Sequence, residues 1–330
     1  MFKFVTLDPW QLPGSRFEIE KEMLEKEGFE VVLADCHTDD DVVAVAKDAD
    51  AIALIYHQMT AELMDRLPKC KLLVRYGIGT DTIDIEAASE RGIVVCNVPD
   101  YCQPDVATHT IALLLDICRK VTYLDRDVRK GNWDSTIGYK VNRVKNLVIG
   151  MYGFGSIART TVQLLSGFEP TIIAYDPYAP DSLFEEFGVK RVTEDELWAQ
   201  SDVISVHTPL TPETKFAINK ESIAKMKEGV IIVNTARGPI IKLDDLLEGL
   251  KSGKVKAAGL DVVEVEPIKD PNAEIYKYDT LIVNPHSAYN SVEAEYELHS
   301  KVGQSAIDVL VKKIIPYNAV NKKVVTKVKE

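Results

Sequence analysis

Three chemically distinctive side chains follow apolar segments in the second half of the chain. Arg237 comes after VIIVNTA, Glu266 lies five residues beyond Asp261 at the end of AAGLDV, and His286 ends LIVNPH. Open α/β sheets place ligand sites at the carboxyl ends of their strands, so we expect these residues to share one edge. A guanidinium binds carboxylates, and an imidazole donates protons near neutral pH. The set predicts a site that binds an anion and supplies a general acid.

A glycine-rich turn precedes this set. The segment VIGMYGFGSIARTTVQLL places Gly153, Gly155 and Ala158 in a G-x-G-x-x-A pattern between an expected strand and an expected helix. Such glycines let the backbone turn and approach a pyrophosphate, which the helix N-terminus then binds. Asp176 follows Gly153 by 23 residues and is placed to bind the adenosine ribose and repel a 2′-phosphate. This indicates NAD rather than NADP, although a turn-forming aspartate before Pro177 is an alternative.

The two patterns together suit hydride transfer to a small 2-keto acid. That reaction needs a cation for the substrate carboxylate and an acid for the developing alkoxide. The chain has 330 residues, of which 46% are hydrophobic and 27% charged, with a net charge of −12. This charge argues against a nucleic-acid surface and makes a locally placed cation necessary for an anionic substrate.

The elements that must position these residues alternate between strands and helices. The first third contains the apolar segments FKFVTLD, FEVVLAD, AIALIY, KLLVRYG and IVVCNV, with helices expected near 16–26, 40–47 and 61–67. A second series begins at VIGMYGFG, after a single helix expected over about 104–130. The expected buried face of that helix is Val106, Ile111, Leu114, Leu115 and Cys118. A helix near 292–315 and a polar tail end the chain. The alternation predicts two parallel-sheet domains.

Compartment signals are few. No apolar run approaches the roughly 20 residues of a membrane span, and MFKFVTLDPW lacks the features of a signal peptide. Five cysteines form no CxxC pair, which is typical of reduced thiols in the cytoplasm. We therefore expect a cytoplasmic protein.

Several longer phrases resemble the D-isomer-specific 2-hydroxyacid dehydrogenases. They are VRYGIGTDTIDIEAASERGIVVCNVP, VHTPLTPET, VNTARG, GLDVVEVEP and NPHSA, in family order from about residue 50 to 290. ALIYHQMT, VRYGIG and VVCNVP most resemble the C-terminal binding protein branch, whose animal members are NAD-binding corepressors. The resemblance implies an α/β fold of two doubly wound parallel-sheet domains with an interdomain cleft. A flavodoxin-like substrate domain would span 1–102 plus 288–330, and a Rossmann NAD-binding domain 103–287.

The resemblance also implies roles. Arg237 would clamp the substrate carboxylate and keto oxygen, His286 would donate the proton, and Glu266 would bond the far imidazole nitrogen. Glu264 is the rival to Glu266, which is preferred because it directly precedes a proline. The expected NAD-binding residues are Gly153, Phe154, Gly155, Ser156, Ile157, Ala158, Asp176, His207, Thr208, Pro209, Thr235, Ala236 and Asp261. The expected substrate-binding residues are His57, Ile78, Gly79, Tyr101 and Tyr289.

Other expectations concern assembly and rivals. The helix from Pro104 and the arm through Trp133 would form a homodimer, as in the family, and no metal is expected. His109 and His299 are interpreted as packing or surface residues. An NAD-sensing corepressor-like protein is the main alternative, disfavoured by the acidic charge and by the lack of a long tail after Ile315. Formate dehydrogenase chemistry is disfavoured by Glu266, where that group carries an amide. The loop Tyr56–Met59 carries neutral or weakly basic groups and favours a substrate with an uncharged side chain; a protonated His57 serving as an additional cation is the alternative.

Overall fold

The computed structural model describes residues 1–326 and 328, which divide into two compact units. Unit 1 combines Met1–Tyr101 with the segment from Ser291 onward, and unit 2 is Cys102–Asn290. The chain therefore passes between the units twice. The sequence placed these passages after residue 102 and before residue 288, whereas the structure divides the chain at 101/102 and 290/291. Each unit is described by itself below.

Unit 1 is built on a five-stranded parallel sheet with the strand order β2-β1-β3-β4-β5. This is the flavodoxin-like order, so the predicted fold of this part is confirmed. Its strands are β1 Lys3–Thr6, β2 Glu30–Leu33, β3 Ala51–Leu54, β4 Leu72–Arg75 and β5 Val94–Cys96. Its helices are α1 Glu18–Lys26, α2 Asp39–Ala46, α3 Ala61–Asp65, α4 Ile85–Glu90 and α12 Val292–Ala306.

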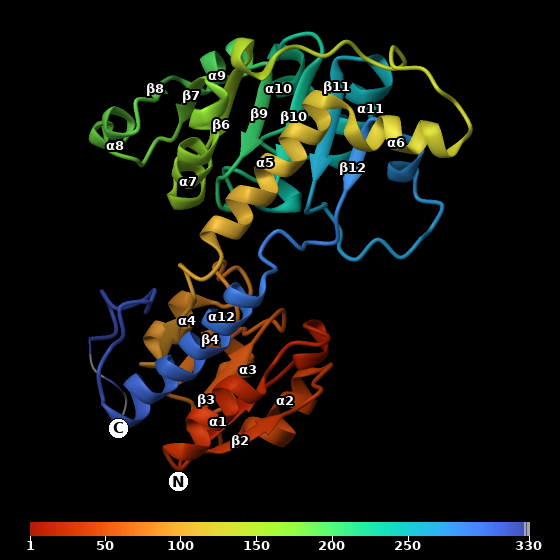
Figure 1. The fold of residues 1–330 in the computed structure, drawn as a ribbon. Coiled ribbons are helices and arrows are strands. Elements are labelled where there is room, and N and C mark those ends of the chain that lie inside the picture. The colour runs from red at the N-terminus through yellow and green to blue at the C-terminus, as the bar shows by residue number, and fades with distance from the viewer. Residues whose placement is uncertain (327, 329–330) are drawn as a thin grey trace. The chain divides into compact units, whose positions relative to one another are not determined.

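Unit 2 is built on a seven-stranded parallel sheet with the order β12-β11-β10-β9-β6-β7-β8 (Figure 1). Read from β8, this is the Rossmann order 3-2-1-4-5-6 with one further strand, so the predicted dinucleotide-binding fold is also confirmed. The strands are β6 Val148–Tyr152, β7 Thr171–Tyr175, β8 Lys190–Arg191, β9 Val203–Val206, β10 Val230–Asn234, β11 Val255–Leu260 and β12 Leu281–Val283. The helices are α5 Gln103–Arg119, α6 Val121–Arg129, α7 Ser156–Leu165, α8 Asp181–Glu186, α9 Glu194–Gln200, α10 Lys220–Lys225 and α11 Leu243–Ser252.

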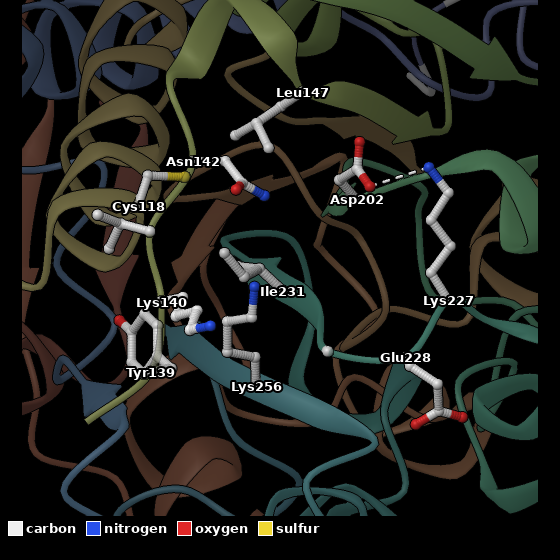
Figure 2. A pocket seen from close by; sticks show the side chains of 12 residues that line it. Cys118, Tyr139, Lys140, Asn142, Leu147, Asp202, Lys227, Glu228, Ile231 and Lys256 are labelled. Carbon is white, nitrogen blue, oxygen red and sulfur yellow. Dashed lines mark hydrogen bonds and ion pairs between the residues drawn. The ribbon is translucent and has the colours of Figure 1, made fainter.

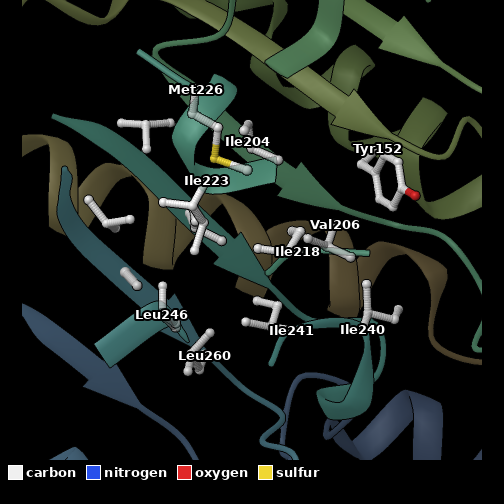
Figure 3. Close-up of a cluster of buried hydrophobic side chains, with 14 of the residues drawn as sticks. Tyr152, Ile204, Val206, Ile218, Ile223, Met226, Ile240, Ile241, Leu246 and Leu260 are labelled. Atoms are coloured by element: carbon white, nitrogen blue, oxygen red, sulfur yellow. The ribbon is translucent and has the colours of Figure 1, made fainter. Parts of the chain in front are cut away.

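The two faces of the unit 2 sheet carry separate apolar cores. Successive strand residues point to opposite faces, so Ile231 and Val233 of β10 pack with α5 and α7, while Val230 and Ile232 pack with α9, α10 and α11. Figure 3 shows part of the second core, in which Ile223 and Leu246 meet the strands. Burial on both faces explains why these strands read as continuous apolar runs in the sequence.

The prediction of a single helix over about 104–130 is wrong, because the helix is interrupted at Lys120. This residue has a left-handed conformation with φ 60°, and its backbone N–H bonds the carbonyls of Asp116 and Ile117. Asp116 then accepts the N–H of Thr122 at 2.7 Å, which starts α6 in a new direction. The buried Lys120 ammonium donates to the carbonyl of Ile137 at 2.6 Å and so ties the following arm to the break.

The last helix is also shorter than expected. α12 ends at Ala306 and is followed by a π-helical turn, Ile307–Val311. In the part of the chain that the structure describes, no helix has both the length and the apolar character that crossing a membrane requires.

Candidate active site

The glycine turn between β6 and α7 is held tightly against the end of β9. Gly153 has φ +97°, and a Cβ atom there would lie 2.8 Å from both the carbonyl carbon of His207 and the nitrogen of Thr208. Gly155 differs, since a Cβ there would meet nothing within 4 Å. The turn therefore needs Gly153 for its own packing, while Gly155 leaves open space at the start of a ten-residue helix that has no side-chain cap. This suits a pyrophosphate bound by the amides of that helix N-terminus.

Asp176, at the end of β7, organises the neighbouring backbone. Its Oδ2 accepts the N–H of Phe154 at 2.8 Å, and its Oδ1 accepts those of Tyr178 and Ala179 at 2.8 and 3.0 Å. The turn-forming role considered from the sequence is thus present. The half-buried carboxylate also lines an open cavity of about 1030 Å³, which it shares with Arg191. A carboxylate offers about four lone-pair directions, so acceptor capacity remains for a ribose hydroxyl.

His207 follows β9 and carries a neutral imidazole. Burial lowers the pKa of His207 to about 4, and Nε2 lies 2.8 Å from the hydroxyl of Ser205. In the following loop, Pro209 accepts the Thr214 hydroxyl through its carbonyl at 2.6 Å. An uncharged ring beside the glycine turn suits packing against a dinucleotide better than binding its phosphates.

The residues after β10 form a tight turn around a buried asparagine. Asn234 accepts the N–H of Ala236 at 3.0 Å and donates to the carbonyl of Arg237 at 2.9 Å. Thr235 shares a 2.7 Å hydrogen bond with Thr110 of α5. Sequence reasoning missed the role of Asn234 in holding this turn. Its place as the last residue of β10, directly before Thr-Ala-Arg, is the signal that could have indicated a side-chain turn.

Gly238 allows the Arg237 turn to approach the loop that follows β11. A Cβ atom at Gly238 would lie 1.8 Å from the carbonyl oxygen of Val263. Any side chain would therefore separate the two loops. The guanidinium of Arg237 donates to the carbonyl of Ala236 at 2.8 Å.

The loops after β11 and β12 bring Glu266 and His286 together. Nδ1 of His286 lies 2.7 Å from Oε2 of Glu266, whose Oε1 accepts the N–H of Val263 at 2.9 Å. Glu264 lies elsewhere, because its Oε2 accepts the N–H of Leu243 at the start of α11 at 3.1 Å. The geometry thus separates the two candidate acids and leaves Nε2 as the imidazole nitrogen that Glu266 does not bond.

Asp261 builds the turn that carries His286. It is 1% exposed, and its two carboxylate oxygens accept the N–H groups of Ser287 and Ala288, each at 2.9 Å. His286 itself adopts φ 53°, a left-handed conformation that is uncommon outside glycine. The sequence predicted a role for Asp261 toward the cofactor, whereas its carboxylate is engaged with this turn.

His109, interpreted from the sequence as a packing or surface residue, packs close to His286. Its Nε2 lies 3.1 Å from Oδ1 of Asn284 and 3.5 Å from Oδ1 of Asp261, so α5 contacts the β11 and β12 loops beside His286. Its position on a helix gave no signal of this. The interpretation of His299 as a packing residue fits its complete burial, 2.6 Å from Glu20 of α1.

The remaining candidates of unit 1 lie around the carboxyl ends of its strands. His57 Nε2 is 3.1 Å from Asp39 Oδ1, and the carbonyl of Ile78, which precedes Gly79, accepts the amide of Asn97 at 2.6 Å. Tyr101 is buried. In unit 2, the Tyr289 ring lies edge-on to His286 at 6.5 Å between centroids. Among the described residues, no group of three or more His, Cys, Asp or Glu side chains could hold a metal ion.

Comparison with known proteins decides the family. Residues 111–288 match the model of the D-isomer specific 2-hydroxyacid dehydrogenase, NAD binding domain. The chain belongs to this dehydrogenase family. Its NAD-binding domain is the region that contains the glycine turn, Asp176 and the Arg237, Glu266 and His286 loops.

Curated relatives carry the names of dehydrogenases and reductases. A D-3-phosphoglycerate dehydrogenase from Methanocaldococcus jannaschii is 36% identical over 94% of this chain, which spans 58% of that relative. A hydroxypyruvate reductase from Blautia hydrogenotrophica is 36% identical over 86% of this chain and 88% of its own length. The chain thus spans little more than half of some relatives. Nothing in these comparisons favours the corepressor alternative.

Solved structures of the family share the whole fold. A D-lactate dehydrogenase from Aquifex aeolicus, complexed with NAD and lactic acid, has a TM-score of 0.81 and 27% identity, covering 94% of this chain and 95% of its own. A D-2-hydroxyisocaproate dehydrogenase has a TM-score of 0.78 and 26% identity, covering 94% of this chain and 97% of its own.

Proposed function

We propose that this protein is an NAD-dependent oxidoreductase that interconverts a small 2-keto acid and the D-2-hydroxy acid. The observation that carries the proposal is the 2.7 Å contact between His286 and Glu266 at the carboxyl edge of a dinucleotide-binding sheet. A carboxylate on one imidazole nitrogen leaves the other to exchange a proton with substrate. Gly238 holds the Arg237 turn against the loop that precedes Glu266.

The residues present fit NAD. The open space at Gly155, the uncapped start of α7 and the Asp176 carboxylate match a pyrophosphate followed by an adenosine ribose. The residues that would hold the cofactor are Gly153, Phe154, Gly155, Ser156, Ile157, Ala158, Asp176, His207, Thr208, Pro209, Thr235 and Ala236. Asp261, expected there from the sequence, is assigned to support of the His286 turn instead. When bound, the nicotinamide supplies or accepts the hydride.

Each catalytic residue then has one task. Arg237 binds the substrate carboxylate and polarises the keto oxygen, which orients the carbonyl. His286 donates a proton from Nε2 to the oxygen as negative charge develops there, and takes it back in oxidation. Glu266 bonds Nδ1 and orients the ring.

The substrate-binding proposals concern both units. Ile78 and Gly79 would offer backbone N–H groups to the carboxylate, with Tyr101 as a second donor, and Tyr289 would form an aromatic wall beside His286. The hydrogen bond from Asn97 to Ile78 supports a rigid loop there. The pairing of His57 with Asp39 supports a site without a free additional cation at this position.

We therefore propose a substrate with an uncharged, partly apolar side chain. The test is NADH oxidation with phenylpyruvate and 2-ketoisocaproate against 3-phosphohydroxypyruvate and oxaloacetate, with the chirality of the product determined. Higher kcat/KM for the first pair is expected, because aromatic surface favours apolar burial by about 25 cal/mol per Å². A preference for either dianion would overturn the substrate class. Absence of turnover with every keto acid would overturn the dehydrogenase proposal.

We also propose a cytoplasmic homodimer whose subunits contact each other through α5, α6 and the arm, the segment after α6 that contains Trp133. Val121 is 60% exposed, Val128 44% and Trp133 91%, which leaves apolar surface on this segment of unit 2. Light scattering after gel filtration should give twice the chain mass, and Val128→Asp should shift it toward the monomer. A monomeric wild-type protein would contradict this.

A further inference from the structure

A second cavity lies at the edge of the unit 2 sheet opposite to the glycine turn. It encloses about 480 Å³ and is lined at the amino ends of β6, β9, β10 and β11, by residues such as Leu147, Asp202, Gly229 and Lys256. The residues assigned above to cofactor and catalysis follow the carboxyl ends of the same strands. The cavity therefore belongs to neither the cofactor site nor the catalytic site.

Two lysines enter this cavity without a carboxylate partner. Lys140 comes from the arm after α6, and Lys256 comes from β11. In Figure 2 the Lys140 side chain lies beside that of Lys256, whose ammonium points toward Ile231. Within the described residues, neither ammonium takes part in an ion pair or hydrogen bond, and the side-chain amide of Asn142 beside them is also without a partner.

The other charges of the cavity are already neutralised locally. Lys227 turns to Asp202 at 2.9 Å (Figure 2). Glu228 pairs with Lys254 at the same distance. Asp202 also accepts the N–H of Val148 at 2.8 Å, so its two oxygens are both engaged. Lys140 and Lys256 are thus two unneutralised like charges facing one space, in a chain whose net charge is −12. Lys140 is exposed and Lys256 half-buried, so water screens the repulsion between them, and an anion between the two ammonium groups would be attracted by both.

The inner wall of the cavity is apolar. Cys118, Leu147 and Ile231 line it and are buried in the core between the sheet and α5. Burial raises the pKa of the Cys118 thiol to about 11, while Lys256 and Arg119 act in the opposite direction, which places the Lys256 charge near this wall. This wall offers a small apolar contact surface beside the two lysines.

We infer that this cavity is a second binding site, for a small anion that presents carboxylate or phosphate oxygens to Lys140 and Lys256. A short apolar body would contact the Cys118 wall. Asn142 would donate a further hydrogen bond. Two ammonium donors on one anionic group give charge-assisted hydrogen bonds, which are stronger than neutral ones.

Anion binding can be measured from the NMR signals of Lys140 and Lys256 themselves. The whole protein is reductively methylated with ¹³C, which keeps the lysine charge, and is titrated with inorganic phosphate or isobutyrate against chloride at constant ionic strength. The Lys140 and Lys256 signals should shift together and saturate at one midpoint. Lys256→Gln should raise the midpoint measured at Lys140 by at least about tenfold, because one charged donor is lost. Lys145→Gln is the matched control, since Lys145 pairs with Glu169 on the surface, and it should leave the midpoint unchanged.

Each outcome decides the inference. If only phosphate saturates the shifts of the two lysine signals, the natural ligand is assigned as a phosphate ester. If isobutyrate saturates them as well, small carboxylates are also assigned as ligands. Shifts that never saturate, that are equal at Lys145, or that survive Lys256→Gln would overturn the site. Loss of the response at dimer-forming concentrations would show that a second copy fills the cavity, which would also overturn it. Neither readout depends on dehydrogenase activity.

Discussion

The carbonyl oxygen of Asp261 accepts the backbone N–H of His286 at 2.8 Å, so the ends of β11 and β12 are tied together at this histidine. The same aspartate holds the next two amides, of Ser287 and Ala288, through its carboxylate. One buried residue therefore supports both the position and the left-handed conformation of His286. The acid–base role that we propose for the imidazole would depend on this support as well as on Glu266.

Replacing Asp261 by Asn should show whether this residue supports the turn at His286 or binds the cofactor. An amide can accept at one oxygen only, so one buried N–H loses its partner and the free energy of unfolding should fall by about 1–3 kcal/mol. We expect kcat to fall while the NADH dissociation constant, measured by fluorescence titration, changes little. A loss of NADH affinity with kcat preserved would instead assign Asp261 to the nicotinamide.

Replacing His286 should remove turnover and spare cofactor binding. Asn is the sharper substitution because it tolerates φ 53°, whereas Ala adds backbone strain. Loss of the general acid should lower kcat by roughly 10²–10⁴-fold or more, with NADH binding retained. His37→Ala, in unit 1 against Trp10, is the control and should keep wild-type kcat. Substantial turnover by His286→Asn would refute the assigned role.

Glu266→Gln should lower kcat by less than His286→Asn does. The amide keeps the size of the side chain but removes the carboxylate oxygen 2.7 Å from Nδ1, so the ring is held less firmly in its orientation. The NADH dissociation constant should be unchanged. Glu264→Gln is the matched control and should keep wild-type kcat, because Glu264 binds the start of α11. A kcat unchanged by Glu266→Gln, or lowered only by Glu264→Gln, would contradict the geometry.

Asp176 should set the preference for NADH over NADPH. Asp176→Ser removes the charge that repels a 2′-phosphate and keeps one acceptor for the local amides. The ratio of kcat/KM with NADH to kcat/KM with NADPH should fall by at least about tenfold, which is equivalent to about 1.4 kcal/mol. The nearby Arg191 is held by Asp181 and by the carbonyl of Asp176, so it does not supply a free cation for the phosphate in the wild type. Equal use of both cofactors by the unaltered protein would refute this prediction.

The free energy of unfolding should decrease at acidic pH, because the imidazole of His207 is buried in its neutral form. Its folded pKa is about 4 against an ordinary value of 6.5, so the unfolded chain binds the proton more tightly. The folded state should therefore lose stability as pH falls from about 6.5 to 4, by at most about 3 kcal/mol from this residue. Urea unfolding of wild type and His207→Gln across this range measures the difference. Parallel pH curves for the two proteins would show that His207 contributes nothing.

Local patterns in the sequence were sufficient for much of this protein. Alternating apolar segments specified two parallel sheets, because strands covered on both faces must be apolar throughout. The spacing of Gly153, Gly155 and Asp176 specified the dinucleotide turn, and the positions of Arg237, Asp261 and His286 after strands specified one edge. These features depend on contacts within a few residues or on the shared direction of parallel strands.

Only the tertiary structure decided which groups meet. Glu264 and Glu266 lie two residues apart on one loop, and the path of that loop sends the first to α11 and the second to His286. The contact of His109 with Asn284 joins residues 175 positions apart, and no local pattern encodes such a distance. The break at Lys120 likewise depends on the carbonyl of Ile137 in the following arm. Helical periodicity continues through residue 120, so the reason for the break lies in contacts made after folding.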